Sequence, residues 1–364
     1  MQAWIFDPNT RSLTLRERAG STPRPGAVIV RMEAAMVLGY MRDVLSGSRG
    51  YAMPDKPFVL GTNAVGTITA IGAGVYHLAD GDSVSIHPHL AADERVKDPA
   101  QILIGLTAMG AQGARDSIDG LSAVGRLQED WGDGVFSQEI EWPARLVTAI
   151  PGLADRPASQ RIALAKFVVP YGGLLRGRLQ PGETVVINGA SGFYGSAASV
   201  LAAELGAGRI VLLGRNETAL KSVADAAGPR ARWVRLEADE DDTSRIVEAA
   251  RGRADLVFDI VGGASSSAST SAALHSLRRG GRLVLMGSCA EPLSVTMGEM
   301  LGNNWEIMGN FMYPVDAPQQ LASLAASGVI DLGLVKTRMF PFSELPAALE
   351  HASTMQGLDL TAIG

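Results

Sequence analysis

The sequence has very little cysteine, with Cys289 alone among 364 residues. A disulfide framework and a cysteine-rich zinc site both need several cysteines, so both are excluded. Cys289 follows a predicted strand, and we expect a small buried side chain rather than a nucleophile. Aromatic residues are also scarce, at 5%, whereas glycine is abundant, at 42 residues. This composition fits an α/β protein with many tight turns.

The chain also lacks an excess of positive charge and a long apolar run. Its net charge is −6 and its basic residues form no cluster, which argues against a nucleic-acid partner. The sequence contains neither a signal-peptide pattern nor an apolar run of membrane-spanning length. We therefore expect a cytoplasmic protein that has no membrane partner. The length favours two domains.

What the chain does contain is a strand, a glycine-rich turn and a helix in direct succession. Residues 184–187 suit a buried strand, and residues 196–205 suit a helix. The order presents backbone N–H groups and a helix N-terminus to a phosphate. Gly192 would let the backbone approach a pyrophosphate, and Gly195 would let the helix pack closely on the strand. The predicted cofactor-binding residues of this turn are Ala190, Ser191, Gly192, Phe193, Tyr194 and Gly195, with Ala190 standing where the usual pattern has its first glycine.

The next apolar segment, residues 209–213, predicts which dinucleotide is bound. It ends in Gly214, Arg215 and Asn216, where the adenosine ribose normally lies. A site for NAD places a carboxylate there to bond the 2′-hydroxyl, whereas a site for NADP needs room and a cation for the 2′-phosphate. Gly214 supplies the room and Arg215 a planar charged group. The sequence therefore favours NADPH, although Arg215 could also be a solvated residue at a helix start.

The rest of the sequence divides into a β-rich part and an α/β part. Up to about residue 150, strands are predicted over residues 28–35, 65–72, 83–86 and 131–139. His87 and His89 could hold a metal together, but we expect them to face solvent at a strand end. Residues 91–133 form a long connection that we expect to have structure of its own or to pack over the active site.

From about residue 153, strands and helices alternate, which predicts a parallel doubly wound sheet. Cofactors bind across the C-terminal strand ends of such sheets, so Val261, Gly262, Gly287 and Ser288 should line the nicotinamide half. The predicted helices are 158–166, 196–205, 218–227, 243–251, 267–277, 317–327 and 345–351, and the predicted strands are 184–187, 209–213, 233–236, 256–260, 282–286 and 305–309.

This order resembles the medium-chain dehydrogenase/reductase superfamily over nearly the whole chain. Residues 60–68 are similar to the family's G-H-E strand entry, and residues 179–185 to its approach to the cofactor motif. Residues 189–195 resemble the quinone-reductase branch. The resemblance implies a GroES-like β-barrel catalytic domain over residues 1–152 and 314–364, and a Rossmann NADPH-binding domain over residues 153–313. It also implies a small-molecule substrate and a homodimer or homotetramer.

The departures from the family pattern concern zinc. At the positions of the zinc ligands the chain has Tyr40 for a cysteine, Thr62 for the histidine, and Ala165-Lys166 near the third ligand; Asn63 replaces the neighbouring glutamate. A catalytic zinc needs about three N, S or carboxylate ligands. We therefore predict no zinc, and the family's four-cysteine structural zinc is impossible with one cysteine.

Without zinc, another group must stabilise negative charge on the substrate. Conjugated enones and quinones spread that charge into an enolate or hydroquinone anion, so hydrogen-bond donors suffice. The resemblance implies this class of reductase. The candidate donors are Tyr40, Asn63, Lys166 and Tyr171, with Tyr40 the first choice because it replaces a ligand and carries a proton. A zinc-free ketone or imine reductase, and a protein that binds NADPH without turnover, are the alternatives.

Overall fold

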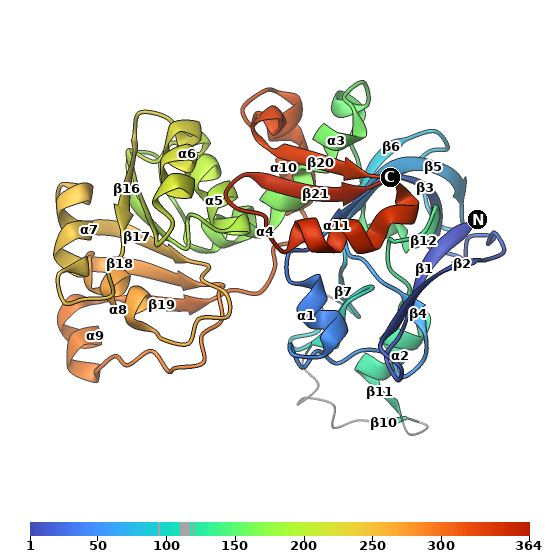
Figure 1. The fold of residues 1–364 in the computed structure, drawn as a ribbon, viewed down its shortest axis with the longest axis horizontal. Coiled ribbons are helices and arrows are strands. Elements are labelled where there is room, and N and C mark those ends of the chain that lie inside the picture. Colours follow the sequence, from blue (N-terminus) through green and yellow to red (C-terminus); the bar gives the residue numbers. More distant parts are fainter. Residues whose placement is uncertain (94, 110–116, 119–120) are drawn as a thin grey trace. The chain divides into compact units, whose positions relative to one another are not determined.

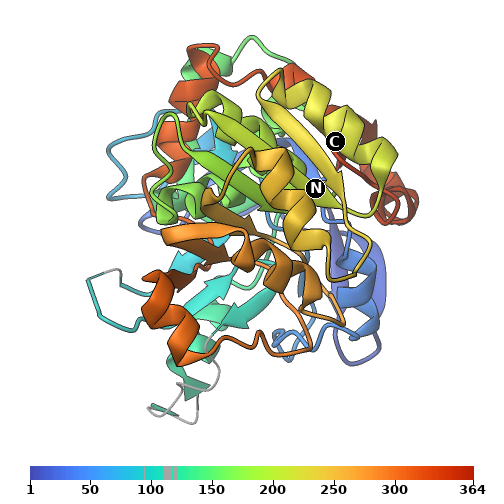
Figure 2. The same ribbon diagram turned by 90° about the vertical axis from the view of Figure 1, so that its left-hand side faces the viewer.

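The computed structural model describes residues 1–93, 95–109, 117–118 and 121–364 (Figures 1 and 2). The chain divides into two compact units. The β unit comprises Met1–Ala165, Thr337–Met355 and Leu360–Gly364, and the Rossmann unit comprises Lys166–Lys336 and Gln356–Asp359. The bounds of these units differ from the predicted domain boundaries at residues 152 and 314. Compact units need not coincide with domains, so the domain boundaries stay a prediction.

The β unit is built around one long strand, β3 (Ala27–Val37), whose two ends are buried. It pairs in antiparallel fashion with β5 (Ala64–Ile71), β12 (Glu139–Pro143) and β21 (Asp359–Ile363). The remaining strands of its seven-stranded sheet are β6 (Ser83–Ile86), β13 (Val147–Ala149) and β20 (Lys336–Phe340). Two strands near the C-terminus therefore join a sheet begun by the N-terminal residues.

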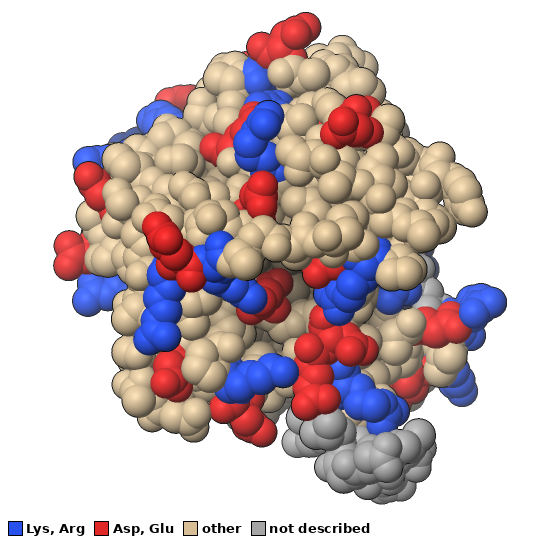
Figure 3. Space-filling model, turned by 90° about the vertical axis from the view of Figure 1, so that its right-hand side faces the viewer, with Lys and Arg blue, Asp and Glu red and all other residues tan. Residues whose placement is uncertain are grey.

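Shorter strands and helices complete the β unit. On the face drawn in Figure 3, acidic and basic side chains are interspersed. The other strands are β1 (Gln2–Asp7), β2 (Ser12–Glu17), β4 (Phe58–Val59), β7 (His89–Ala91), β8 (Gln101–Leu103), β9 (Thr107–Met109), β10 (Ser117–Ile118) and β11 (Leu121–Ser122). The helices are α1 (Met41–Ser46), α2 (Ala123–Asp130), α3 (Ala158–Arg161) and α11 (Leu345–Ala352), with 3-10 turns at Ala144–Leu146, Pro151–Leu153 and Phe342–Glu344. The long connection 91–133 thus has structure of its own, but its residues 94, 110–116 and 119–120 lie outside the described residues.

The Rossmann unit holds a six-stranded parallel sheet in the order β16-β15-β14-β17-β18-β19. This confirms the predicted doubly wound sheet. The strands are β14 (Thr184–Asn188), β15 (Arg209–Gly214), β16 (Ala231–Arg235), β17 (Ala254–Asp259), β18 (Leu277–Leu285) and β19 (Glu306–Gly309). The order reverses at β14, where β15 lies on one side and β17 on the other. Ligands bind at such a reversal point.

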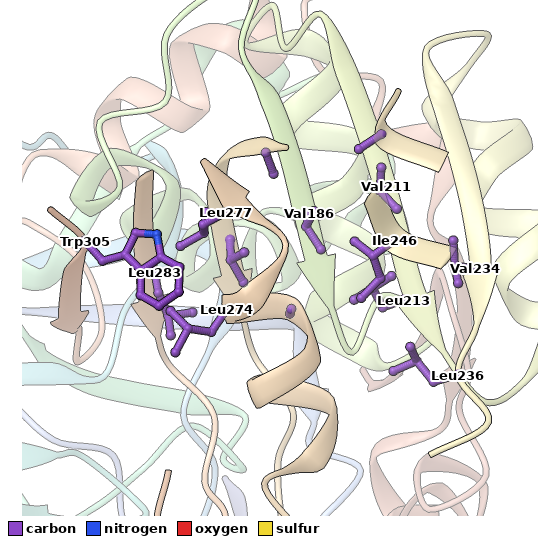
Figure 4. Close-up of a cluster of buried hydrophobic side chains, with 14 residues drawn as sticks. Val186, Val211, Leu213, Val234, Leu236, Ile246, Leu274, Leu277, Leu283 and Trp305 are labelled. Atoms are coloured by element: carbon purple, nitrogen blue, oxygen red, sulfur yellow. The ribbon is translucent and has the colours of Figure 1, made fainter. Parts of the chain in front are cut away.

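Helices cover the sheet of the Rossmann unit, and the apolar residues of its strands form the core. Val186, Val211 and Leu213 of the sheet pack with Ile246 of α7 and Leu274 of α8 (Figure 4). The helices are α4 (Leu164–Arg176), α5 (Phe193–Glu204), α6 (Glu217–Ala227), α7 (Asp242–Ala250), α8 (Ala268–His275), α9 (Met297–Asn303) and α10 (Ala317–Ala326), with a 3-10 turn at Leu332–Leu334.

The structure corrects two predicted elements. The strand predicted over residues 131–139 begins only at Glu139, because Gly134 lies against the backbone of Gly61 instead of in a strand ladder: a Cβ on Gly134 would lie 2.2 Å from Gly61 O. The helix predicted over residues 158–166 is two helices, α3 and a longer α4 that continues through Pro170. A Cβ on Gly173 would lie 2.3 Å from Phe258 Cε2, so glycine lets α4 approach the sheet.

Candidate cofactor site and active-site residues

The glycine-rich turn follows β14 and has the geometry of a phosphate-binding turn. Gly189 has φ +86°, a left-handed conformation that favours glycine, and Ala190 is fully buried. Gly192 is the N-cap residue of α5, and no side chain caps the helix there. The N–H groups of the first helical turn lack partners within the helix, so an anion can accept hydrogen bonds from them.

Close packing in the turn explains why glycine occupies position 195. A Cβ on Gly195 would lie 2.1 Å from Gly189 O and 2.9 Å from Ala190 Cα. Any larger residue would push α5 away from the turn, so the short approach depends on Gly195. Phe193 and Tyr194 begin the helix, and their rings meet edge to face at 4.8 Å between centroids.

Gly214, Arg215 and Asn216 lie at the C-terminal end of β15, next to this turn. A Cβ on Gly214 would lie 2.7 Å from Ser191 Oγ and 3.2 Å from Leu220 Cδ2, so a side chain at position 214 requires the Ser191 side chain to move. Arg215 is exposed, and no carboxylate among the described residues pairs with it. Asn216 caps α6, with its Oδ1 accepting a hydrogen bond from Ala219 N at 3.0 Å.

The predicted nicotinamide-side residues meet at the ends of β17 and β18. Ser288 N donates to Val261 O at 2.9 Å, and a Cβ on Gly287 would lie 2.2 Å from the same oxygen. Gly262 is exposed. The Cβ position of Gly189 lies 3.2 Å from Val261 Cγ2, which joins this cluster to the glycine-rich turn. The structure thus brings the two groups of predicted cofactor residues to one edge of the sheet.

A buried carboxylate fixes that edge. Asp259 ends β17, and its Oδ2 accepts hydrogen bonds from Asn188 Nδ2 and Thr270 Oγ1, both at 2.7 Å. Its Oδ1 accepts from Val261 N at 3.1 Å. Burial raises the pKa of Asp259, while these hydrogen bonds act in the opposite direction.

Two of the predicted donors, Lys166 and Tyr171, lie on α4 and make contacts inside the Rossmann unit. Lys166 is fully buried, and its Nζ donates to Gly357 O at 3.0 Å and to Asp359 O at 3.1 Å. Burial holds the pKa of Lys166 well below its ordinary value, against the attraction of Asp359. Tyr171 Oη donates to Gln320 Oε1 at 2.9 Å. These contacts explain both residues structurally, and their role as donors to a substrate stays a prediction.

The other two predicted donors, Tyr40 and Asn63, lie in the β unit. Tyr40 is the half-buried N-cap residue of α1, with the Arg49 guanidinium 4.5 Å from its ring centroid and the Tyr51 ring edge to face at 6.4 Å. Asn63 is buried, and its Nδ2 donates to Ile86 O at 3.4 Å. Their neighbour Thr62 is buried, and its hydroxyl has no hydrogen-bond partner among the described residues.

The side chains that the family resemblance places at the zinc-ligand positions are of types that do not usually bind zinc. Tyr40 and Thr62 offer hydroxyl groups, Ala165 offers no donor atom, and the Lys166 ammonium donates to two carbonyls. Zinc sites use cysteine, histidine or carboxylate ligands. Among the residues that the structure describes, no group of three histidine, cysteine, aspartate or glutamate side chains could hold a metal ion.

Two side chains lie elsewhere than predicted. His87 was predicted to face solvent but is only 4% exposed, because the chain continues from β6 into the interior, and burial lowers its pKa to about 3. Cys289 was predicted to be buried but is exposed; it lies four residues beyond β18, where it forms an isolated parallel bridge with Ala264.

Sequence reasoning missed the segment Gln356–Asp359. Asn216 Nδ2 donates to Gln356 Oε1 at 2.6 Å, and Gly357 N donates to Ser191 O at 3.0 Å. The segment therefore contacts both the glycine-rich turn and the N-cap of α6. No motif in the sequence marks it, because each contact joins residues more than a hundred positions apart.

The chain thus joins a β unit to a parallel doubly wound sheet that has a glycine-rich turn at its reversal point. Residues 24–152 match the alcohol dehydrogenase GroES-like domain, and residues 195–327 match the zinc-binding dehydrogenase domain. The chain belongs to the medium-chain dehydrogenase/reductase superfamily, as its sequence predicts. Within the described residues, no helix is long and apolar enough to cross a membrane.

The individual proteins to which the chain is similar share less than 30% of its residues. The chain is 26% identical to sorbitol dehydrogenase of Bacillus subtilis (strain 168), over 94% of this chain and 91% of that protein. It is 28% identical to acryloyl-coenzyme A reductase of Metallosphaera sedula, over 79% and 77%. Among solved structures, a putative zinc-binding dehydrogenase from Sinorhizobium meliloti 1021 bound to NADP is similar, with TM-score 0.79, 19% identity, and coverage of 100% and 98%. This last likeness shows the fold alone.

Proposed function

We propose that this protein is a zinc-independent, NADPH-dependent oxidoreductase that transfers hydride to an activated alkene, such as an enone or enoyl group, or to a quinone. The observation that carries the proposal is the set of side chains at the zinc-ligand positions. Tyr40, Thr62 and Ala165 replace ligands that a Lewis-acid mechanism needs. The name of the acryloyl-coenzyme A reductase relative supports an activated alkene as the acceptor.

The ribose end of the site supports NADPH as the donor of hydride. Gly214 supplies no carboxylate to bond a 2′-hydroxyl, and Ser191 Oγ lies 2.7 Å from its Cβ position. The exposed Arg215 guanidinium is suited to a phosphate, with which it can form two parallel hydrogen bonds. The glycine-rich turn and the N-terminus of α5 would hold the pyrophosphate, and Val261, Gly262, Gly287 and Ser288 would line the nicotinamide.

The protein's own groups would then serve the acceptor. When NADPH is bound, its nicotinamide supplies the hydride. The β-carbon of the alkene accepts that hydride, and the charge moves to the carbonyl oxygen as an enolate. Tyr40 is the first candidate to donate a hydrogen bond, and later a proton, to this anion, and Asn63 is a candidate for a further hydrogen bond. Lys166 and Tyr171 remain less favoured candidates, since each is engaged within the Rossmann unit.

A second candidate function is the reduction of a ketone or imine without zinc. The sorbitol dehydrogenase relatives favour it, since a sugar alcohol and its ketone form a carbonyl couple. A protein that binds NADPH without turnover is the third possibility. The glycine-rich turn does not distinguish this possibility from an enzyme, because the turn would bind the cofactor in both cases and turnover needs other residues.

The test combines metal analysis with a substrate panel. We expect protein purified without a metal-binding tag to contain far less than one zinc per chain, and to oxidise NADPH with enones, enoyl thioesters or quinones. Stoichiometric zinc that is needed for activity would contradict the proposal. Turnover of ketones or cyclic imines alone would favour the second candidate, and tight NADPH binding with no oxidation across the panel would favour the third.

We also propose that the protein is a homodimer or homotetramer, assembled through β19. This strand ends the sheet order, so its outer edge can pair with a second copy. In the helix preceding it, Met297 is 86% exposed and Leu301 is 78% exposed. Sedimentation of the wild-type protein and of Leu301→Glu tests this assembly, since a monomeric wild type would contradict it.

A further inference from the structure

The segment Gln356–Asp359, called the strap below, belongs to the Rossmann unit although the chain on both sides of it belongs to the β unit. Its backbone is tied to the glycine-rich turn. Gly357 N donates to Ser191 O at 3.0 Å, and Gly357 O accepts from Ser196 Oγ at 2.5 Å. Within the strap, Gln356 N donates to Asp359 Oδ2 at 3.1 Å. The strap is therefore fixed against the residues predicted to bind the cofactor.

Lys166 holds the strap through hydrogen bonds to its backbone. Its buried Nζ donates to the carbonyl oxygens of Gly357 and Asp359 and lies 3.6 Å from the ring centroid of Phe193. Both of these hydrogen bonds go to backbone carbonyls and neither goes to a carboxylate. Burial of an ammonium group is costly unless hydrogen bonds replace water. Lys166 thus donates hydrogen bonds to two carbonyls of the strap and also contacts the ring of Phe193, the first residue of α5. These contacts hold the strap against the start of α5.

The hydrogen bonds around Asn216 determine which way the Gln356 amide points. Ala219 N donates to Asn216 Oδ1, so the Asn216 amide nitrogen is the group that faces Gln356. Asn216 Nδ2 donates to Gln356 Oε1 at 2.6 Å, so the Gln356 oxygen is occupied and its Nε2 is the outward end. Gln356 is exposed, and no described residue accepts a hydrogen bond from Nε2. The Gln356 amide therefore keeps two N–H donors, and it is held at Asn216, the residue that follows Arg215 at the end of β15.

We propose that Gln356 is a further specificity-determining residue, which donates a hydrogen bond from Nε2 to the 2′-phosphate of NADPH, and that Lys166 is its positioning residue. The inference rests on the proposed use of NADPH. A neutral amide donor bonds a charged phosphate oxygen more strongly than a ribose 2′-hydroxyl, because hydrogen bonds to a charged acceptor are about twice as strong as those to a neutral one. In this role Lys166 acts through the strap and does not contact the cofactor.

The test measures the dissociation constants of NADPH and NADH by titration, for the full-length wild type and its variants. For Gln356→Glu we expect NADPH to bind about tenfold more weakly, since the carboxylate repels the phosphate, while NADH changes less than about twofold. Gln356→Met keeps the length but removes the donors, and should weaken NADPH about threefold. Gln319→Glu, an equally exposed change on α10, is the matched control and should leave both constants unchanged.

Lys166→Met tests the positioning role with the ratio of the two dissociation constants. We expect the preference for NADPH to fall by about threefold or more, because the variant removes the donor that holds the Gly357 and Asp359 carbonyls of the strap. If this variant does not fold, the exposed Gln356 variants still decide the proposal. A merely structural lysine would change the melting temperature but leave the ratio of the constants as in wild type.

The outcomes distinguish a failure of the proposed role of Gln356 from a failure of the proposed use of NADPH. If the wild type binds NADH as tightly as NADPH, the proposed cofactor is wrong and the inference falls with it. If the wild type prefers NADPH, Arg215→Ala abolishes that preference, and both Gln356 variants keep it, then only the inference is overturned.

Discussion

The amide of Asn188 donates to the carboxylate of Asp259 at 2.7 Å, and this buried pair joins the C-terminal ends of β14 and β17. The two strands flank the point where the sheet order reverses. Thr270 Oγ1 and Val261 N also donate to Asp259, so a single carboxylate satisfies three donors. The glycine-rich turn and the loop that begins at Val261 are thereby held together.

The first prediction concerns the stability of this pair. We expect Asp259→Ala to lower the free energy of unfolding by about 3 kcal/mol, because it leaves buried donors without an acceptor. Asp255→Ala, at the other end of β17, removes a partly buried carboxylate that pairs with Arg278 and accepts from Thr184 N at 2.8 Å. It should lower the free energy of unfolding by about 1 kcal/mol. Urea unfolding measures both, and equal losses would show that Asp259 does not hold the strand ends.

The part of the site that follows from the sequence is local. Residues 184–195 are contiguous, and their apolar strand, glycine spacing and helix each have a direct physical meaning. The parallel sheet follows for the same reason, since strands and helices alternate along the chain. The return of residues 314–364 to the first domain was predicted, but the strands β20 and β21 were not, because β21 pairs with β3 at the opposite end of the sequence.

Side-chain environments were harder to predict because they depend on distant residues. Lys166 and Gly357 are 191 positions apart, and nothing near either residue reveals their contact. The histidine pair was misjudged for a similar reason: His87 is buried, whereas its neighbour His89 is half-buried and bonds Gln101. Local polarity at a strand end predicts exposure, but the packing of the β unit decides it.

The second prediction follows from the burial of His87. Its pKa is lowered from 6.5 to about 3 by burial, so it stays neutral in the folded protein while the unfolded chain takes up a proton below pH 6.5. Stability therefore falls as pH is lowered from 6.5 towards 3, by at most about 1.4 kcal/mol per pH unit. His87→Gln cannot take up that proton. Urea titrations at pH 6 and pH 5 should show a loss about 1 kcal/mol smaller in the variant, and identical losses would contradict the prediction.

The third prediction uses the contact between Gly214 and Ser191. Gly214→Asp should weaken NADPH binding at least about tenfold without creating tight NADH binding, because the new Cβ would lie 2.7 Å from Ser191 Oγ. The double variant Gly214→Asp with Ser191→Gly relieves that contact and should bind NADH better than NADPH. Ser191→Gly alone is the control and should keep the wild-type preference. Tight NADH binding by the single Gly214→Asp variant would contradict the prediction, because it would show that the Ser191 side chain moves aside at little cost.

The fourth prediction concerns Tyr40 as a donor to the substrate. Tyr40→Phe keeps the ring contacts with Arg49 and Tyr51 but removes the hydroxyl, and should lower kcat at least about tenfold with a smaller effect on KM. Tyr51→Phe is the matched control, since it removes a hydroxyl from the neighbouring ring, and should keep kcat within about twofold. An unchanged kcat in Tyr40→Phe would exclude the role and leave Asn63 as the candidate in the β unit.

The fifth prediction concerns the glycines that let α4 lie against the sheet. A Cβ on Gly173 would lie 2.2 Å from Met286 Sδ and 2.3 Å from Phe258 Cε2, so Gly173→Ala should lower the free energy of unfolding by about 1–3 kcal/mol. Helix propensity alone predicts the opposite sign, because alanine is favoured over glycine by about 1 kcal/mol in a helix. Gly302→Ala in α9 is the control, since no atom lies within 4 Å of its Cβ position, and it should be neutral or stabilising. Thermal and urea unfolding of the two variants therefore separate packing from propensity. Stabilisation by Gly173→Ala would mean that α4 can move away from β17 and β18 without cost.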